Sequence, residues 1–461
     1  MLSIWSLLML KGKATPRLTL NYGVRYEYNS VWEETNVRVS NFDYATQQIL
    51  PPGIPFYQPD RNDFGPRLGF AYDPCGSGKT VIRGFGGIFY LPQLQGAVNS
   101  LPSNNFPNVE VTVFQDPTLA FPVPAVLPAT ASAHDVNALD PHLRDTYSEQ
   151  WGLNVQRELF PQIVFTLGYT GNHGVKLPAG AAYAGLELNN INPLTGARPS
   201  AAFGEERLLG DFLSSNYNAL QITARRHAGR VTFDANYTWS HEIDNAPSIF
   251  SAFEDSNNIN ADRGHGDIDV RHNFTADVLY DLPSLHNQAS AFRGALGGWR
   301  AGTILQARSG LPVNIALQPA FFATSILRPD YVPGQDPNAG PRQVNPADVK
   351  VKWFNVDAFQ AAANGTIGNV GRNTIHGPGY ANLDGSIAKN FPVIESVRVK
   401  FQAEFYNFTN SVNFLVDNPG SSPNALRMQN RTPAQNVNTP FGAMLADRGG
   451  RVLQFSLRLE F

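Results

Sequence analysis

Apolar and polar residues alternate along many stretches of this chain, and the alternation continues to the last residue. In the closing stretch RVLQFSLRLEF, residues 451–461, every second side chain is apolar. Successive side chains of a strand point to opposite faces, so this period of two predicts an amphipathic β-strand. The apolar face of this strand consists of Leu453, Phe455, Leu457, Leu459 and Phe461.

The same alternation recurs throughout the sequence and predicts about a dozen strands of about 10–14 residues. Strands of soluble sandwiches typically have about 5–6 residues, whereas a tilted strand that crosses a bilayer needs about 9–11. The strand lengths therefore favour a membrane protein. Regular alternation covers 17–29, 62–73, 147–160, 163–171, 231–240, 273–280, 397–405 and 451–461, and less regular strands are predicted near 79–90, 215–227, 299–309 and 380–391.

Long and short connections alternate between these strands. Short turns such as 74–78 and 227–230 separate long connections such as 91–145 and 310–379. Outer-membrane barrels have short periplasmic turns and long extracellular loops, and backbone groups in hydrocarbon must be paired within the sheet. The prediction is an all-β fold: an antiparallel transmembrane β-barrel, or a large part of one. The first predicted strand then runs outward and the last inward, with both chain ends on the periplasmic side.

Composition narrows the alternatives further. The net charge is −3, from 35 basic and 38 acidic residues, which gives no reason to expect a nucleic-acid partner. The single cysteine, Cys75, excludes an internal disulfide framework. Residues 1–14 are predicted to be a segment outside the barrel or a mis-started N-terminus, and the barrel is assigned to 15–461.

Two stretches resemble sites of known chemistry. CGSGKT, residues 75–80, lacks the first glycine of a phosphate-binding loop because position 73 is Asp73, so it is interpreted as a hairpin turn. DRGHGDIDVRH, residues 262–272, contains carboxylates and histidines that could bind Ca²⁺ or a transition metal. Its spacing matches no defined metal loop, so it is interpreted as a solvated loop.

No catalytic, cofactor or metal site is predicted. His241 and Asp244 could belong to a hydrolase triad with a serine, but no Gly-x-Ser-x-Gly nucleophile elbow is present. The sequence therefore predicts a protein that is not an enzyme.

Eleven stretches resemble, in order, the C-terminal barrel of Oar-like TonB-dependent outer-membrane receptors. Examples are TPRLTLNYGVRYEY at 15–28, DIDVRHNFTADVLYDLP at 267–283 and FGAMLADRGGRVLQFSLRLEF at 441–461. The remaining stretches are 64–74, 80–90, 167–177, 215–226, 235–246, 295–315, 367–391 and 400–414.

This resemblance implies a bacterial outer-membrane protein that takes up an unidentified substrate, such as a carbohydrate or a peptide. Family members also carry a TonB box, a plug domain and a barrel of about 22 strands. The sequence is therefore interpreted as the C-terminal portion of such a barrel, which would meet the TonB complex only through the N-terminal part that it lacks. A self-closed passive porin is the alternative, followed by a secreted adhesin or glycan-binding protein.

The resemblance and the alternation also imply roles for single residues. The terminal strand with Phe461 resembles the signal that the barrel-assembly machinery recognises, and its apolar face would contact outer-membrane lipid. Four basic residues are predicted to face the lumen, where they would contact substrate or pair with acidic residues of a plug. These are Arg25, Arg67, Arg398 and Lys400.

Overall fold

Among the residues that it describes, the computed structural model contains one main sheet of sixteen strands, five two-stranded sheets and two short 3₁₀ helices. Within the described residues, no helix is both long and apolar enough to cross a membrane. The structure describes residues 3–92, 102–105, 134–179, 186–190, 197–246, 253–285, 294–317, 327–343, 345, 347–348, 350–363, 366–394, 397–415, 427–428, 441–444 and 446–461.

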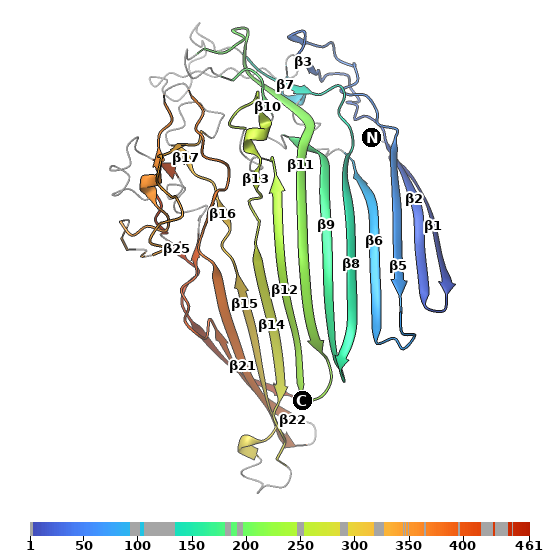
Figure 1. The fold of residues 1–461 in the computed structure, drawn as a ribbon, viewed down its shortest axis with the longest axis vertical. Helices are drawn as coiled ribbons and strands as arrows, with labels where there is room; N and C mark the ends of the chain where they lie inside the picture. The colour runs from blue at the N-terminus through green and yellow to red at the C-terminus, as the bar shows by residue number, and fades with distance from the viewer. Residues whose placement is uncertain are drawn as a thin grey trace.

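One large sheet forms a curved wall along the length of the molecule (Figure 1). Among the described residues it has sixteen strands, and three short ones pair beside the main path, which leaves thirteen wall strands in chain order. The wall strands are β1 (Ser3–Thr15), β2 (Leu18–Asn29), β5 (Asp63–Tyr72), β6 (Thr80–Leu91), β8 (Thr146–Phe160), β9 (Ile163–Ala179), β11 (Phe203–Arg226), β12 (Val231–Asp244), β14 (His272–Asp281), β15 (Trp299–Arg308), β21 (Tyr380–Ile394), β22 (Val397–Tyr406) and β26 (Val452–Glu460).

The remaining elements are short and lie outside the main path. β10 (Leu186–Glu187) and β7 (His134–Leu139) pair with the N-terminal part of β11, which we call its loop-side half. β13 (Gly264–His265) pairs with the end of β12. The others are β3 (Phe42–Asp43), β4 (Gln48–Ile49), β16 (Pro312–Val313), β17 (Ala316–Leu317), β18 (Asp330–Tyr331), β19 (Phe359–Gln360), β20 (Ile375–His376), β23 (Phe414–Leu415), β24 (Arg427–Met428), β25 (Ala446–Asp447), η1 (Ile259–Asp262) and η2 (Val356–Ala358).

The first wall strand corrects the sequence prediction. Residues 1–14 were expected outside the barrel, but Ser3–Thr15 forms β1 and pairs with β2 from Ser3 opposite Asn29 to Thr15 opposite Leu18. The alternation of apolar and polar residues that marks the other strands is absent here, because β1 carries apolar side chains on both faces. Leu8 lies opposite Val24, and Leu7 lies opposite Arg25. β1 therefore begins at the end of the wall where the long connections lie, which we call the loop end. The opposite end, where short turns join the strands, is the turn end (Figure 1).

The two edge strands of the wall run in the same direction. Each neighbouring pair along the main path is antiparallel, so β1 and β26, which are the first and the last of thirteen strands, are parallel to each other. No pairing joins them within the described part of the chain. Figure 1 accordingly shows an open, curved sheet with β1 at one margin and β21 and β22 toward the opposite one.

The connections alternate as the sequence predicts. Short turns join the wall strands at one end, for example at 161–162 and 227–230, while the long connections gather at the other end (Figure 1). The CGSGKT stretch is one of the short turns: the carboxylate of Asp73 accepts the backbone N–H groups of Cys75, Gly76 and Gly78. Gly76 and Gly78 both have positive φ, which glycine adopts without strain. The interpretation as a hairpin turn is confirmed.

The wall has one apolar and one polar face. In the last strand pair, Leu457 lies opposite Phe401 on the apolar face and Ser456 lies opposite Gln402 on the polar face. The apolar side chains of β26 and of Phe461 directly after it are largely exposed, from 52% at Leu453 to 96% at Phe461. This arrangement fits a wall that exposes its apolar face to lipid and its polar face to an aqueous lumen.

The buried hydrophobic residues lie mainly in the loops rather than in the wall. One cluster centres on three phenylalanines, Phe354, Phe359 and Phe441, whose rings pack edge to face with centroids 5.2–6.0 Å apart. Such burial gives the long connections a core of their own. The loops therefore form a packed platform at one end of the wall.

Candidate functional site

Two buried arginines organise the loop platform: Arg328 joins two of its connections, and Arg372 joins it to the wall. Arg328 forms ion pairs with Glu254 and Asp262, and the Arg328 side chain is only 3% exposed. Its Nε also donates to the carbonyl oxygen of Val370 at 2.8 Å. Burial raises the pKa of Glu254 to about 7, because desolvation outweighs the attraction of the neighbouring guanidinium. This cluster joins the connection after β12 to the connection before β21.

Arg372 provides the second attachment. Its guanidinium pairs with Asp244 at the end of β12, and its NH1 lies 3.6 Å from the Asp267 carboxylate. NH2 also donates to the Asp244 carbonyl oxygen at 3.3 Å. A buried guanidinium whose two terminal nitrogens are both engaged in this way fixes the geometry of the segments that it joins. The platform is thus clamped to the loop end of the central strands.

A histidine cluster lies beside this clamp. His241 Nδ1 lies 3.1 Å and His265 Nδ1 lies 3.4 Å from the same oxygen, Asp269 Oδ2. The rings of His241 and His265 are 4.9 Å apart, and the His376 ring is 5.3 Å from that of His265. Burial and the neighbouring imidazoles lower the pKa of both His265 and His376, which favours their neutral forms.

The polar stretch 262–272 therefore does not act as one unit. His265 and Asp269 join His241, but Asp262 pairs with Arg328, and Asp267 accepts from Asn373 Nδ2 at 2.7 Å. The His272 ring instead stacks on Tyr237 and shares a 2.8 Å hydrogen bond with its hydroxyl group.

The hydrolase interpretation also finds no support among the described residues. His241 contacts Asp269 rather than Asp244, and Asp244 is engaged by Arg372. His241 was not predicted from the sequence to be a partner of residues 262–272. The only available signal was that His241 lies near the end of an amphipathic strand, directly before the loop that carries His265 and Asp269.

A cavity of about 480 Å³ opens on the polar face below the platform. Side chains of the central strands line its floor, including Tyr217, Gln221 and Thr238, and the backbone around Asp269 lies at its rim. Hydroxyl and amide groups of this kind can hydrogen-bond a polar ligand. The cavity lies where β9, β11, β12 and β14 meet the platform.

The four basic residues predicted to face the lumen lie on the polar face, but they are not brought together. Arg25 on β2 forms an ion pair with Glu27 at 2.7 Å, and the Arg67 guanidinium on β5 lies 4.5 Å from the centroid of the Phe89 ring. Arg398 and Lys400 lie on β22, opposite Glu460 and Arg458 of β26. Eight wall strands separate the two groups along the main path of the described sheet. Contact of any of them with substrate stays a prediction.

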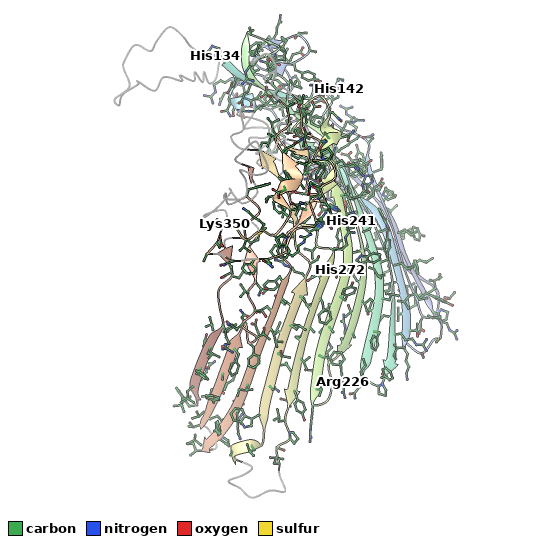
Figure 2. All side chains as sticks on the ribbon, turned by 60° about the vertical axis from the view of Figure 1, so that its left-hand side comes forward. His134, His142, Arg226, His241, His272 and Lys350 are labelled. Carbon is green, nitrogen blue, oxygen red and sulfur yellow. The ribbon has the colours of Figure 1, made fainter. Side chains whose placement is uncertain are left out.

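Side-chain sticks show the same division of the molecule (Figure 2). His241 lies where the wall strands meet the loop platform, with His272 lower on the same part of the wall, whereas Arg226 lies near the turn end. The clustered titratable groups therefore lie at the loop end of the central strands. This is the end at which an outer-membrane barrel meets the extracellular medium.

Comparison with known proteins places the chain in a family. The family described as outer membrane beta barrel domain matches residues 13–454. A comparison with curated proteins finds no match.

Solved outer-membrane proteins are similar to the chain at low sequence identity. The outer membrane transporter YddB from Escherichia coli superposes with a TM-score of 0.49 and 8% identity, over 99% of this chain and 45% of that chain. The ferripyoverdine receptor of the outer membrane of Pseudomonas aeruginosa gives a TM-score of 0.47 and 10% identity, over 99% of this chain and 38% of that chain. The FrpB iron transporter from Neisseria meningitidis gives a TM-score of 0.45 and 10% identity, over 99% of this chain and 45% of that chain. The chain thus spans less than half the length of each of these structures.

Proposed function

We propose that this chain, which belongs to the outer membrane beta barrel domain family and lies in the bacterial outer membrane, is the C-terminal wall of an Oar-like TonB-dependent receptor. In this proposal the complete barrel takes up an unidentified carbohydrate or peptide. The platform and the cavity beneath it would capture that substrate, and no chemical step is assigned to the chain. The ordered stretches between 15 and 461 that resemble the Oar-like group support this subgroup.

The parallel orientation of the two edge strands is the observation that carries the proposal. Barrels of a single bacterial chain have an even number of antiparallel strands, and an unpaired edge is not tolerated in hydrocarbon. Thirteen wall strands with β1 parallel to β26 cannot close by an antiparallel pairing of these two edges. This orientation supports the proposal that further strands of a larger receptor barrel lie between β26 and β1.

The self-closed porin is the second candidate, and conductance separates the two. Residues 1–461, refolded and added to a planar lipid bilayer, are expected to give no stable channel because the wall is incomplete. A stable, uniform unit conductance would support the porin and contradict the proposal.

The gene neighbourhood provides an independent test. The proposal expects the DNA directly upstream of codon 1 to encode a plug domain and earlier barrel strands, in frame or separated by a frameshift. A separate promoter followed by a signal peptide would contradict the proposal. Binding of labelled oligosaccharides and peptides to the complete receptor would then distinguish the two substrate classes.

A further inference from the structure

We infer that His241, His265 and Asp269 form a binding site for one divalent transition-metal cation of the Zn²⁺ class at the extracellular end of the wall. The inference rests on the geometry of these three side chains and is independent of the substrate that the barrel takes up. Neither the family match nor the resemblance to receptors assigns a metal to them.

The backbone holds the two histidines side by side. Ile243 of β12 pairs with His265 of β13, and Asp244 pairs with Gly264, so β13 continues the sheet beside the end of β12. His241 lies two residues before Ile243 in the regularly paired part of β12, and therefore on the same face. This pairing accounts for the 4.9 Å between the two ring centroids.

The third side chain is also fixed in position. Asp269 Oδ1 accepts the backbone N–H of Glu242 at 2.9 Å, and the Asp269 N–H donates to the Gly266 carbonyl oxygen at 3.0 Å. These bonds direct the second oxygen, Oδ2, toward both imidazoles. The Asp269 side chain is 1% exposed, so its charge is largely removed from water. A buried carboxylate of this kind requires a cationic partner or several donors.

The hydrogen bonds of the cluster are incomplete without a cation. His241 Nδ1 and His265 Nδ1 both approach Asp269 Oδ2, and His265 Nδ1 is buried without a hydrogen-bond partner in the described structure. A neutral imidazole whose Nδ1 carries no proton offers a lone pair there. A cation between the three groups would accept that lone pair together with those of His241 and Asp269.

The distances between the donor atoms fit a small coordination sphere. Zinc binds imidazole nitrogen and carboxylate oxygen at roughly 2.0–2.2 Å, so two ligands of a tetrahedral site are roughly 3.4 Å apart. The observed separations are 3.1 and 3.4 Å, and the three donor atoms all lie within 4.8 Å of one another. Only small side-chain rotations would bring the three atoms to bonding distance.

The ligand types select the class of cation. Imidazole suits Zn²⁺, Cu²⁺ and Ni²⁺, whereas Ca²⁺ and Mg²⁺ prefer sites made entirely of oxygen. Three protein ligands leave a fourth position for water or for a group from a bound molecule. The His376 ring lies 5.3 Å from the His265 ring, so His376 is the nearest candidate for that position.

One neighbouring charge opposes cation binding. Arg271 NH2 lies 3.8 Å from Asp269 Oδ2, and its side chain is about one-third exposed. The guanidinium can therefore turn toward solvent when a divalent cation approaches. Arg271 thus competes with the metal for the Asp269 carboxylate, and its removal should strengthen metal binding.

The main test is titration of the full chain in detergent with ZnCl₂ after removal of metals by a chelator. Calorimetry should show one Zn²⁺ per chain. His265→Ala and Asp269→Asn should each weaken binding at least tenfold, and Arg271→Ala should strengthen it. His272→Ala is the matched control, because this histidine bonds Tyr237 and lies outside the cluster, so its affinity should equal that of the wild type.

Several results would overturn the inference. These are the absence of saturable Zn²⁺ binding, an affinity that does not change in His265→Ala, or an equal loss in His272→Ala. If the cluster variants fail to fold, X-ray absorption of the zinc-loaded wild type still decides the question. The inference requires at least two imidazole ligands on the metal, and a spectrum with fewer would contradict it.

Discussion

Arg372 forms a buried ion pair with Asp244, although 128 positions separate the two residues in the sequence. Asp244 is the last residue of β12, and Arg372 lies in the long connection before β21. This pair, together with the Arg328 cluster, determines how the platform sits on the wall. The first prediction concerns its removal.

Arg372→Ala should release the platform from the wall. The substitution leaves the buried carboxylate of Asp244 without its partner, which typically costs about 3–5 kcal/mol. We expect faster hydrogen exchange in 366–376 and 253–269, while the lower part of β12 remains protected. The control is Arg300→Ala, which removes an exposed ion pair with Asp281 and should cost at most about 1 kcal/mol. Equal effects of the two substitutions would contradict the role given to Arg372.

The loop-side half of β11 should lose stability as pH rises. Glu187 of β10 is buried, and burial raises its pKa to about 7 from the ordinary value of 4.5. The folded state therefore holds this proton more tightly than the unfolded state. Its contribution is fully present below about pH 4.5 and is lost as pH rises through about 7, on the order of 1–3 kcal/mol.

Hydrogen exchange of 203–209 between pH 5 and pH 8, corrected for intrinsic rates, measures this loss. Glu187→Gln should make the protection independent of pH in that window. An amide retains the acceptor that Glu187 Oε1 presents to the backbone N–H groups of Asn189 and Glu206, each at 2.9 Å. The same pH profile in the variant would exclude Glu187 as its cause.

Two glycines on the polar face of neighbouring strands should respond differently to the same substitution. A Cβ at Gly152 would lie 2.5 Å from the Phe85 ring, whereas a Cβ at Gly168 would lie 3.4 Å from the Asn154 Cβ. Gly152→Ala should therefore displace the ring and cost about 1–3 kcal/mol in a urea titration. Gly168→Ala should be close to neutral. Similar midpoints for the two variants would show that Phe85 moves aside without cost.

The wall could be predicted from the sequence because its determinants are local. Alternation within β2 or β26 depends on neighbouring residues alone, and lipid and lumen select opposite side chains. β1 was missed because Ile4–Leu10 is apolar on both faces. The platform was missed for a different reason: Arg328 meets Glu254 across 74 positions, and no periodic pattern encodes such a contact.

The candidate site also combines features that the local sequence indicates with contacts between distant residues. His265 and Asp269 belong to a stretch whose composition suggested metal ligands, but composition alone could not separate them from Asp262 and Asp267, which bind arginines. The pairing of β13 with β12 distinguishes these residues, because it brings His265 beside His241. Prediction of the cluster from sequence therefore requires the strand register first.

The last strand provides the sharpest test of which face meets lipid. Leu457 lies on the apolar face and Ser456 on the polar face of β26. In the complete barrel, Leu457→Arg should place a charge in hydrocarbon and cost about 2–4 kcal/mol near the bilayer midplane, whereas Ser456→Arg should face water and cost little. The measurement is the fraction of barrel that becomes protease-resistant in the outer membrane.

The terminal residue should act at an earlier step, during assembly. The Phe461 side chain is almost fully exposed and makes little contact with the wall, so Phe461→Ser should leave the stability of the inserted barrel nearly unchanged. If the terminal aromatic residue is read by the assembly machinery, the same substitution should slow insertion in cells but not spontaneous refolding into liposomes. Leu457→Arg, by contrast, should impair both. Normal insertion of Phe461→Ser in cells would exclude Phe461 as the signal and leave the apolar face of β26 as the remaining determinant.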